Sequence, residues 1–73
     1  MAKLIQIKPK NLARAITKIG FYKHNQAGSH ATFKHPDGRR VTIPMHNRNL
    51  KKGLLHGILK DIELTTDAFK DLI

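Results

Sequence analysis

Residues 30–44 read HATFKHPDGRRVTIP and carry the most regular pattern of the chain. Two segments of alternating apolar and polar residues, 30–35 and 40–43, flank the turn signal Pro36-Asp37-Gly38, in which proline presets φ and glycine accepts a positive φ. Pro44 should end the second segment because proline has no N–H to donate to a strand ladder. The stretch therefore predicts an antiparallel hairpin.

Alternation also assigns the two faces of this hairpin, since successive side chains of a strand point to opposite sides. The apolar positions, predicted to face the core, are Ala31, Phe33, Val41 and Ile43. The opposite face is polar and basic and carries His30, Thr32, Lys34, Arg40 and Thr42. One polar face is typical of an antiparallel sheet that helices cover on the other side only.

The preceding segment predicts a helix and a further strand. Pro9 suits a first helical turn, and apolar residues at helical spacing continue to residue 19. Gly20 stands where a glycine ends a helix in the left-handed conformation. We expect a strand over residues 21–25 and a turn over residues 26–29. On another face of the helix, a basic row follows at four-residue spacing: Lys10, Arg14 and Lys18.

The segment after Pro44 predicts two more helices. An apolar stripe indicates a helix from about residue 50 to residue 62, which Asn47 or Asn49 can cap. Gly53 and Gly57 lie inside it and suggest close backbone packing. A short helix over about residues 66–72 would be capped by Thr65, with Leu64 and Phe69 at the positions of a hydrophobic staple.

The resulting order is α-β-β-β-α-α, which predicts an α+β fold with a three-stranded antiparallel sheet and helices on one face. The sequence contains no internal repeat, low-complexity tract or linker. We therefore expect one domain over residues 1–73.

Charge is strongly positive and unevenly distributed. Fourteen Lys and Arg oppose five acids, for a net charge of +9. Residues 1–60 hold thirteen cations and one acid (+12), whereas residues 61–73 hold one cation and four acids (−3). A pI of about 10.4 is typical of nucleic-acid binding. A surface kept basic for solubility, or for an acidic protein partner, is the alternative.

Cysteine is absent, so disulfides, thiol nucleophiles and cysteine zinc sites are excluded. Near the first residue, the apolar residues Leu4, Ile5 and Ile7 are interrupted by Gln6 and Lys8. This short, interrupted stretch does not form the apolar core of a signal peptide. We expect a cytoplasmic protein without a membrane segment.

Histidine is the residue type that best fits a catalytic role. Only Asp37 is acidic among residues 1–60, and two-metal nuclease chemistry needs clustered acids. None of the five histidines forms a pair with zinc-protease spacing, so we expect neither a metal nor another cofactor. RNA supplies its own nucleophile, the 2′-OH. A histidine can move the protons, and nearby cations can stabilise the phosphorane charge.

Four short motifs resemble the HicA (YcfA-like) mRNA interferase family. They are Gly-Ser-His at residues 28–30, FKHPDGRRVTIPMH at 33–46, LKKG at 50–53 and ILK at 58–60. The resemblance implies a fold similar to a double-stranded-RNA-binding domain. It further implies a ribonuclease toxin of a type II toxin–antitoxin pair, which a HicB-type antitoxin neutralises. Two positions depart from the frequent family pattern, Ala31 and Leu54.

The family's catalytic histidine corresponds to His30, and Gly28 and Ser29 correspond to the turn that presents it. We expect His30 to act as general base or general acid, with His46 as a candidate for the second proton transfer. The candidate RNA-binding residues are Lys10, Arg14, Lys18, Lys34, Arg40, Lys51 and Lys52. Two alternatives remain open, an RNA-binding module without catalysis and a protein-interaction subunit with a basic face.

Overall fold

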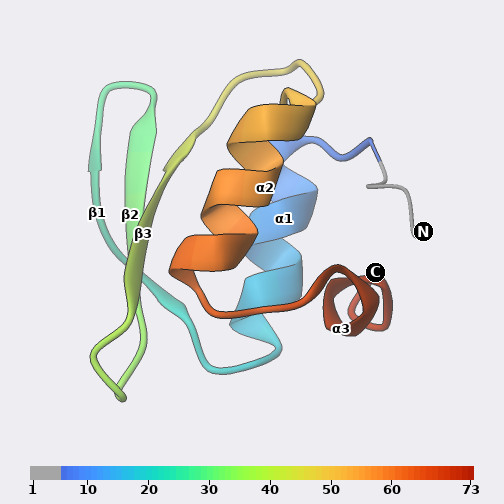
Figure 1. The fold of residues 1–73 in the computed structure, drawn as a ribbon. Helices are drawn as coiled ribbons and strands as arrows, with labels where there is room; N and C mark the ends of the chain where they lie inside the picture. Colours follow the sequence, from blue (N-terminus) through green and yellow to red (C-terminus); the bar gives the residue numbers. More distant parts are fainter. Residues whose placement is uncertain (1–5) are drawn as a thin grey trace.

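The computed structural model describes residues 6–73 and contains three helices and three strands (Figure 1). Leu4 and Ile5, part of the interrupted apolar stretch near the first residue, lie outside the described residues. The elements follow in the order α1 (Pro9–Thr17), β1 (Tyr22–Ala27), β2 (His30–Lys34), β3 (Arg40–Pro44), α2 (Lys52–Asp61) and α3 (Thr66–Lys70). Among these residues no helix has the length and apolarity needed to cross a membrane.

The three strands form one antiparallel sheet in the order β1-β2-β3. In β2 and β3 the buried and exposed positions alternate, with Ala31, Phe33, Val41 and Ile43 on the buried side. The helices lie on that side of the sheet (Figure 1). The predicted α+β fold with one covered face is therefore confirmed.

A single apolar cluster joins the sheet to the helices. The side chains of Leu12 and Ile16 from α1 and of Leu55 and Ile58 from α2 are buried in it. Phe69 of α3 is fully buried in the same cluster. No polar or charged side chain of residues 6–73 is buried, so the cationic groups of these residues remain at or near the surface.

The end of α1 confirms the role expected for Gly20. Its φ is +103°, and its N–H donates to the carbonyl of Thr17 while the N–H of Phe21 donates to the carbonyl of Ile16. This pair of bonds is the Schellman arrangement, which satisfies the last carbonyls of a helix. It turns the chain sharply from α1 into β1.

The first strand is longer than expected, and two predicted boundaries are wrong. Phe21 is buried ahead of the strand, and pairing continues through Gln26 and Ala27, which lie opposite Ala31 and His30. The turn therefore consists of Gly28 and Ser29 alone, instead of the predicted residues 26–29. The register also shifts at His24, between Lys23 and Asn25, which indicates a β-bulge.

Helix α2 begins later than predicted, and neither Asn47 nor Asn49 caps it. Lys51 occupies the N-cap position without a side-chain cap. The N–H of Leu50 donates instead to the carbonyl of Ile7, and the side-chain amide of Asn49 donates to Gln6. These bonds hold the approach to the helix against the segment before α1.

Two further expectations concern the glycines of α2 and the cap of α3. A Cβ at Gly53 or Gly57 would meet nothing within 4 Å among the described residues, so the close backbone packing expected there is not found. The hydroxyl of Thr65 accepts a hydrogen bond from the N–H of Ala68, which confirms the predicted cap. The helix itself is shorter than the predicted 66–72.

Candidate active site

A two-residue turn between β1 and β2 presents His30. Ala27 and His30 are paired, and Gly28 and Ser29 connect them. Gly28 has a φ of +58°, while Ser29 is not among the positive-φ residues, the pattern of a type II′ hairpin turn. A Cβ at Gly28 would meet nothing within 4 Å. The turn therefore needs glycine for its backbone conformation rather than for space.

His30 is the first residue of β2, and its side chain lies exposed on the uncovered face of the sheet. Its cross-strand partners are Ala27 on β1 and Pro44 on β3. Both neighbours have small or compact side chains, so neither places a charge or a long side chain beside the imidazole. The next pair along this face, Thr32 and Thr42, is joined through its hydroxyl groups, 3.4 Å apart. A ligand can thus reach the ring from solvent.

His46 follows β3 two residues after Pro44, the cross-strand partner of His30. The N–H of Met45 donates to the carbonyl of Ser29, so antiparallel pairing continues one residue past Pro44. Met45 is partly buried and His46 is exposed, as the alternation of β3 would give if it continued past Pro44. The fold therefore brings His30 and His46, the two histidines predicted to be catalytic, to the same end of the sheet.

A backbone hydrogen bond selects the tautomer of His46. The N–H of Arg48 donates to Nδ1 of His46 at 3.1 Å. Because Nδ1 accepts this bond, the neutral ring carries its proton on Nε2. The exposed side of His46 is then a hydrogen-bond donor. Arg48, which sequence reasoning did not single out, thus orients a candidate residue, and its only sequence signal was its position two residues after His46.

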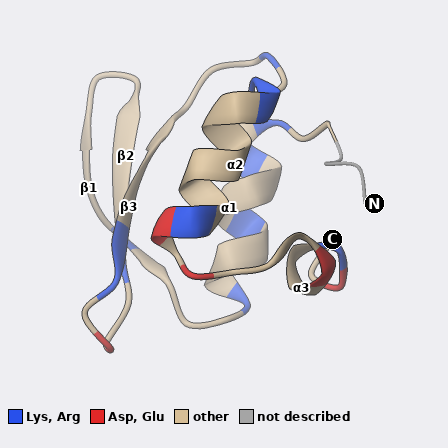
Figure 2. Cartoon of the chain, viewed as in Figure 1, with Lys and Arg blue, Asp and Glu red and all other residues tan. Residues whose placement is uncertain are grey.

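The predicted cations do not gather around His30. Lys34 and Arg40 are directly opposite each other on the same sheet face, but four residues along β2 from His30, a separation of about 13 Å. Lys51 and Lys52 stand at the start of α2. Figure 2 shows this end of α2 on the same end of the molecule as the β1–β2 turn. Lys10 and Arg14 lie on α1 and Lys18 at its C-cap, on the covered side of the sheet.

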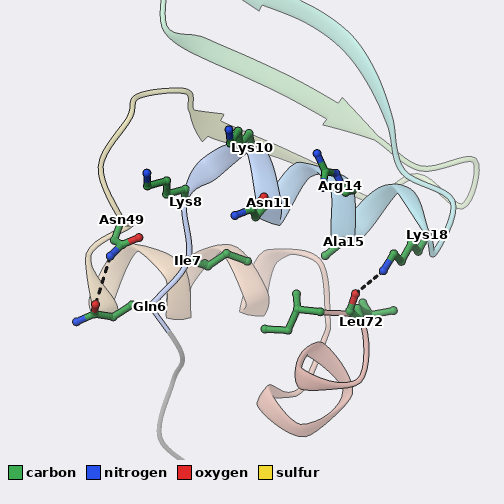
Figure 3. Close-up of a pocket in the computed structure, with 11 residues that line it drawn as sticks. Gln6, Ile7, Lys8, Lys10, Asn11, Arg14, Ala15, Lys18, Asn49 and Leu72 are labelled. Atoms are coloured by element: carbon green, nitrogen blue, oxygen red, sulfur yellow. Dashed lines mark hydrogen bonds between the residues drawn. The ribbon is translucent and has the colours of Figure 1, made fainter.

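A groove of about 580 Å³ runs beside α1, and Lys10, Arg14 and Lys18 line it. Lys8, which was not predicted as a binding residue, lines it too (Figure 3). The signal for Lys8 was its place in Lys8-Pro9-Lys10, where the buried proline leaves both lysines at the surface. Lys18 donates a hydrogen bond to the carbonyl of Leu72, 2.8 Å away, so it also has a structural role.

His35, by contrast, has the contacts of a structural residue. Its Nε2 lies 2.8 Å from the carbonyl of Ile19, and its Nδ1 accepts from the N–H of Asp37 at 3.1 Å. The ring also packs edge-on against Phe21, with 4.9 Å between ring centroids. Both nitrogens are engaged, so His35 ties the β2–β3 turn to the end of α1.

Asp37 and Arg39 extend this connection. Arg39 Nε donates to Asp37 Oδ2 at 2.7 Å, and Arg39 Nη1 donates to the carbonyl of Ile62 at the end of α2. The guanidinium also lies 5.1 Å from the centre of the Phe21 ring. The hydrogen bond from the backbone N–H of Arg39, followed by the Arg39 side chain, holds the pKa of Asp37 below its ordinary value.

A metal site has no obvious place in this arrangement. Among residues 6–73, no three His, Asp or Glu side chains converge as metal ligands would. The chemistry available at the exposed end of the sheet is proton transfer and hydrogen-bond donation by imidazole. That the reaction proceeds without a metal ion stays a prediction.

Comparison with known proteins identifies one family. The family model described as HicA toxin of bacterial toxin-antitoxin matches residues 9–64. This range begins with α1, ends just after α2, and includes the turn, His30 and His46. No curated protein matches the chain.

Proposed function

The chain belongs to the HicA toxin family of bacterial toxin–antitoxin systems, and we propose that it is an endoribonuclease that cleaves mRNA with His30 and without a metal ion. One observation carries the proposal. The histidine of the Gly-Ser-His motif stands exposed at the start of β2, on the polar face of the sheet, directly after a glycine-dependent turn. An imidazole in this position can meet a phosphodiester from solvent.

In the proposed reaction a ribose 2′-OH of the RNA attacks the adjacent phosphodiester. His30 accepts the proton of the 2′-OH while O2′ forms a bond to the adjacent phosphorus. The P–O5′ bond breaks, and the leaving 5′-oxygen takes up a proton. The products are a 2′,3′-cyclic phosphate and a free 5′-OH. Histidine suits this role because it exchanges protons near neutral pH.

His46 supplies either of two functions at the same end of the sheet. With its proton on Nε2, the neutral ring donates a hydrogen bond to a phosphorane oxygen, which stabilises the developing charge. To protonate the leaving oxygen as an imidazolium, the ring must first give up the hydrogen bond from Arg48 N–H to Nδ1. The observed contact therefore favours charge stabilisation, and water then protonates the leaving oxygen.

The ends of the RNA products test this mechanism. Mass spectrometry of the fragments should find 2′,3′-cyclic phosphate, or its hydrolysis product 3′-phosphate, on one side of each cut and 5′-OH on the other. Fragments with 5′-phosphate and 3′-OH ends would contradict 2′-OH attack. Replacement of His46 by Ala should lower the cleavage rate and leave the acidic limb of the pH–rate profile, which reports the general base His30, in place. An alkaline limb that is present in the wild type and lost in His46→Ala would make His46 the general acid instead.

As a toxin of such a system, the protein has an antitoxin partner. We propose a HicB-type protein that brings acidic groups to the basic surface, and an mRNA substrate puts the action of the toxin in the cytoplasm. The second candidate function is an RNA-binding module without catalysis, which the basic groove beside α1 favours. Salt-sensitive RNA binding without any cleavage would support that alternative.

A further inference from the structure

The groove beside α1 has a composition that suits a nucleotide. We propose that it is a second RNA site, separate from the cleavage site, which holds a single-stranded segment of the substrate several nucleotides from the cut. The consequence of this second site for catalysis rests on the proposed ribonuclease function. The binding itself is tested independently of cleavage.

The rim of the groove is cationic. Lys8, Lys10 and Arg14 are exposed along one side of it (Figure 3). Lys10 and Arg14 are four residues apart on α1, which corresponds to about 6 Å along the helix axis. This step is comparable with the distance between successive phosphates of an extended strand. No Asp or Glu side chain is among the residues that line the groove.

The groove also has an apolar part and a set of amides. Ile7 and Ala15 line it, together with Leu72 from the segment after α3. Asn11 and Asn49 add side-chain amides, which can donate to and accept from base edges or a ribose 2′-OH. An apolar surface beside cations and amides matches base, phosphate and sugar together. An acidic peptide would use the cations alone.

Two hydrogen bonds define the ends of the groove. At one end the Asn49 amide donates to Gln6 over 3.3 Å, and at the other Lys18 Nζ donates to the carbonyl of Leu72 over 2.8 Å (Figure 3). These contacts connect the segment before α1, the β3–α2 loop and the segment after α3. A ligand in the groove would contact all of them and should therefore stabilise the fold.

The groove and His30 face different sides of the molecule. Helix α1 packs its buried side chains, including Leu12 and Ile16, against the covered face of the sheet, whereas His30 stands on the uncovered face. The molecule measures 34 × 28 × 17 Å, so a strand of several nucleotides can pass from one side to the other. A dinucleotide at His30 cannot also reach the groove. Cleavage of long RNA should therefore depend on groove cations, and cleavage of a minimal substrate should not.

The binding test uses the His30→Ala protein, so that RNA stays intact, and a fluorescently labelled single-stranded RNA. A variant that also carries Lys10→Gln and Arg14→Gln should bind about tenfold more weakly at low salt. Its slope of log K against log salt should fall by about 1.4, because each phosphate contact on a single strand contributes about 0.7. The matched control, Lys60→Gln with Lys70→Gln, removes the same charge outside the groove and should keep most of the affinity.

The catalytic test uses the same paired substitutions in the protein with His30 intact. The groove variant should show a raised KM for long mRNA and an unchanged rate on dinucleoside monophosphates. Equal affinity and equal slope in the groove variant and the control would overturn the proposal and leave the role of His30 untouched. A groove variant that keeps RNA binding but loses binding to polyglutamate would assign the groove to an acidic protein and also overturn it. If the wild type never cleaves RNA, the proposed function fails while the binding result still decides the groove.

Discussion

At the scale of single residues, the placement of His30 depends on Gly28. The turn has only two residues, and the first has a φ of +58°, a conformation in which an L side chain is strained. The same turn fixes where β2 begins and therefore which side chain emerges first on the uncovered face. The motif Gly-Ser-His thus has a structural reason for its glycine as well as a chemical reason for its histidine.

Gly28→Ala should therefore destabilise the protein by about 1–2 kcal/mol, the usual cost of a left-handed conformation for a residue with a Cβ. Gly53→Ala is the matched control, because Gly53 lies in α2 with open space around its Cβ position. That change should stabilise the protein by up to about 1 kcal/mol. Urea unfolding of both variants measures the difference, and equal effects of the same sign would refute the role given to the turn.

At the scale of elements, the β2–β3 turn is fastened to two helices. His35 contacts the carbonyl of Ile19 at the end of α1, and Arg39 contacts the carbonyl of Ile62 at the end of α2. A Cβ at Gly20 would lie 2.7 Å from His35 Nε2. The hairpin that carries the polar face is thereby held in register against the helical layer.

This close approach predicts a coupling between Gly20 and His35. Gly20→Ala should cost more than the strain of about 1–2 kcal/mol that its positive φ alone imposes, since the new methyl group also displaces the His35 ring. In a His35→Ala background the same substitution should cost only the strain. A double-mutant cycle of unfolding free energies measures the coupling, and strictly additive effects would mean that the two residues do not constrain each other.

Asp37 makes the contribution of the β2–β3 turn to folding stability depend on pH. Because its pKa in the folded protein lies below its ordinary value of 3.8, its contribution to stability is complete above that value and is lost as the pH falls through the folded pKa. The stability difference between wild type and Asp37→Asn should therefore shrink between about pH 5 and about pH 2. Unfolding curves across this range test it. A difference that does not change with pH would contradict the assignment.

The sequence predicted the elements whose signals are local and missed those set by tertiary contacts. Alternation identified the faces of β2 and β3, and Gly20 and Thr65 marked their helix ends because each acts within a few residues. The start of α2 was wrong because Leu50 uses its N–H for Ile7, a bond that no local pattern reveals. The extra residues of β1 were missed because Gln26 and Ala27 are polar or small and gain their strand conformation only from pairing with β2.

The candidate site likewise has features that the sequence predicted from local signals and features that only tertiary contacts set. The motif located His30, and alternation assigned it to the polar face. The separation of Lys34 and Arg40 from His30 follows only from the strand register. The bond from Arg48 to His46 and the place of Lys8 in the groove depend on a loop and a chain approach that the sequence does not specify. The family model supplies the family, and it leaves the role of each residue to experiment.

At the scale of the whole molecule, positive charge covers several surfaces rather than one. Figure 2 shows Lys and Arg on α1, at both ends of α2 and near the β2–β3 turn, while all acids but Asp37 lie between the end of α2 and the residue after α3. A field of this kind accelerates association with polyanions and acidic proteins, and salt screens it. The charge at residues 1–60 should therefore act on the encounter with RNA and with the antitoxin alike.

Association with the antitoxin should accordingly slow as the ionic strength rises, whereas dissociation should change little. Stopped-flow measurement of both rate constants over a salt series tests this. Lys60→Gln with Lys70→Gln should reduce the association rate at low salt, because long-range attraction depends on total charge as well as on contacts. An association rate that is independent of salt would show that charge does not guide the antitoxin.

The most direct test of the central claim is cleavage of a long single-stranded mRNA in EDTA by the wild-type protein, His30→Ala and His56→Ala. His56 is an exposed histidine of α2 away from the sheet, so it controls for the loss of any surface imidazole. We predict cleavage by wild type and by His56→Ala, and a rate about 10²–10⁴-fold lower for His30→Ala, with unchanged folding by circular dichroism. Equal cleavage by all three proteins, or no cleavage until a divalent metal is added, would contradict the account.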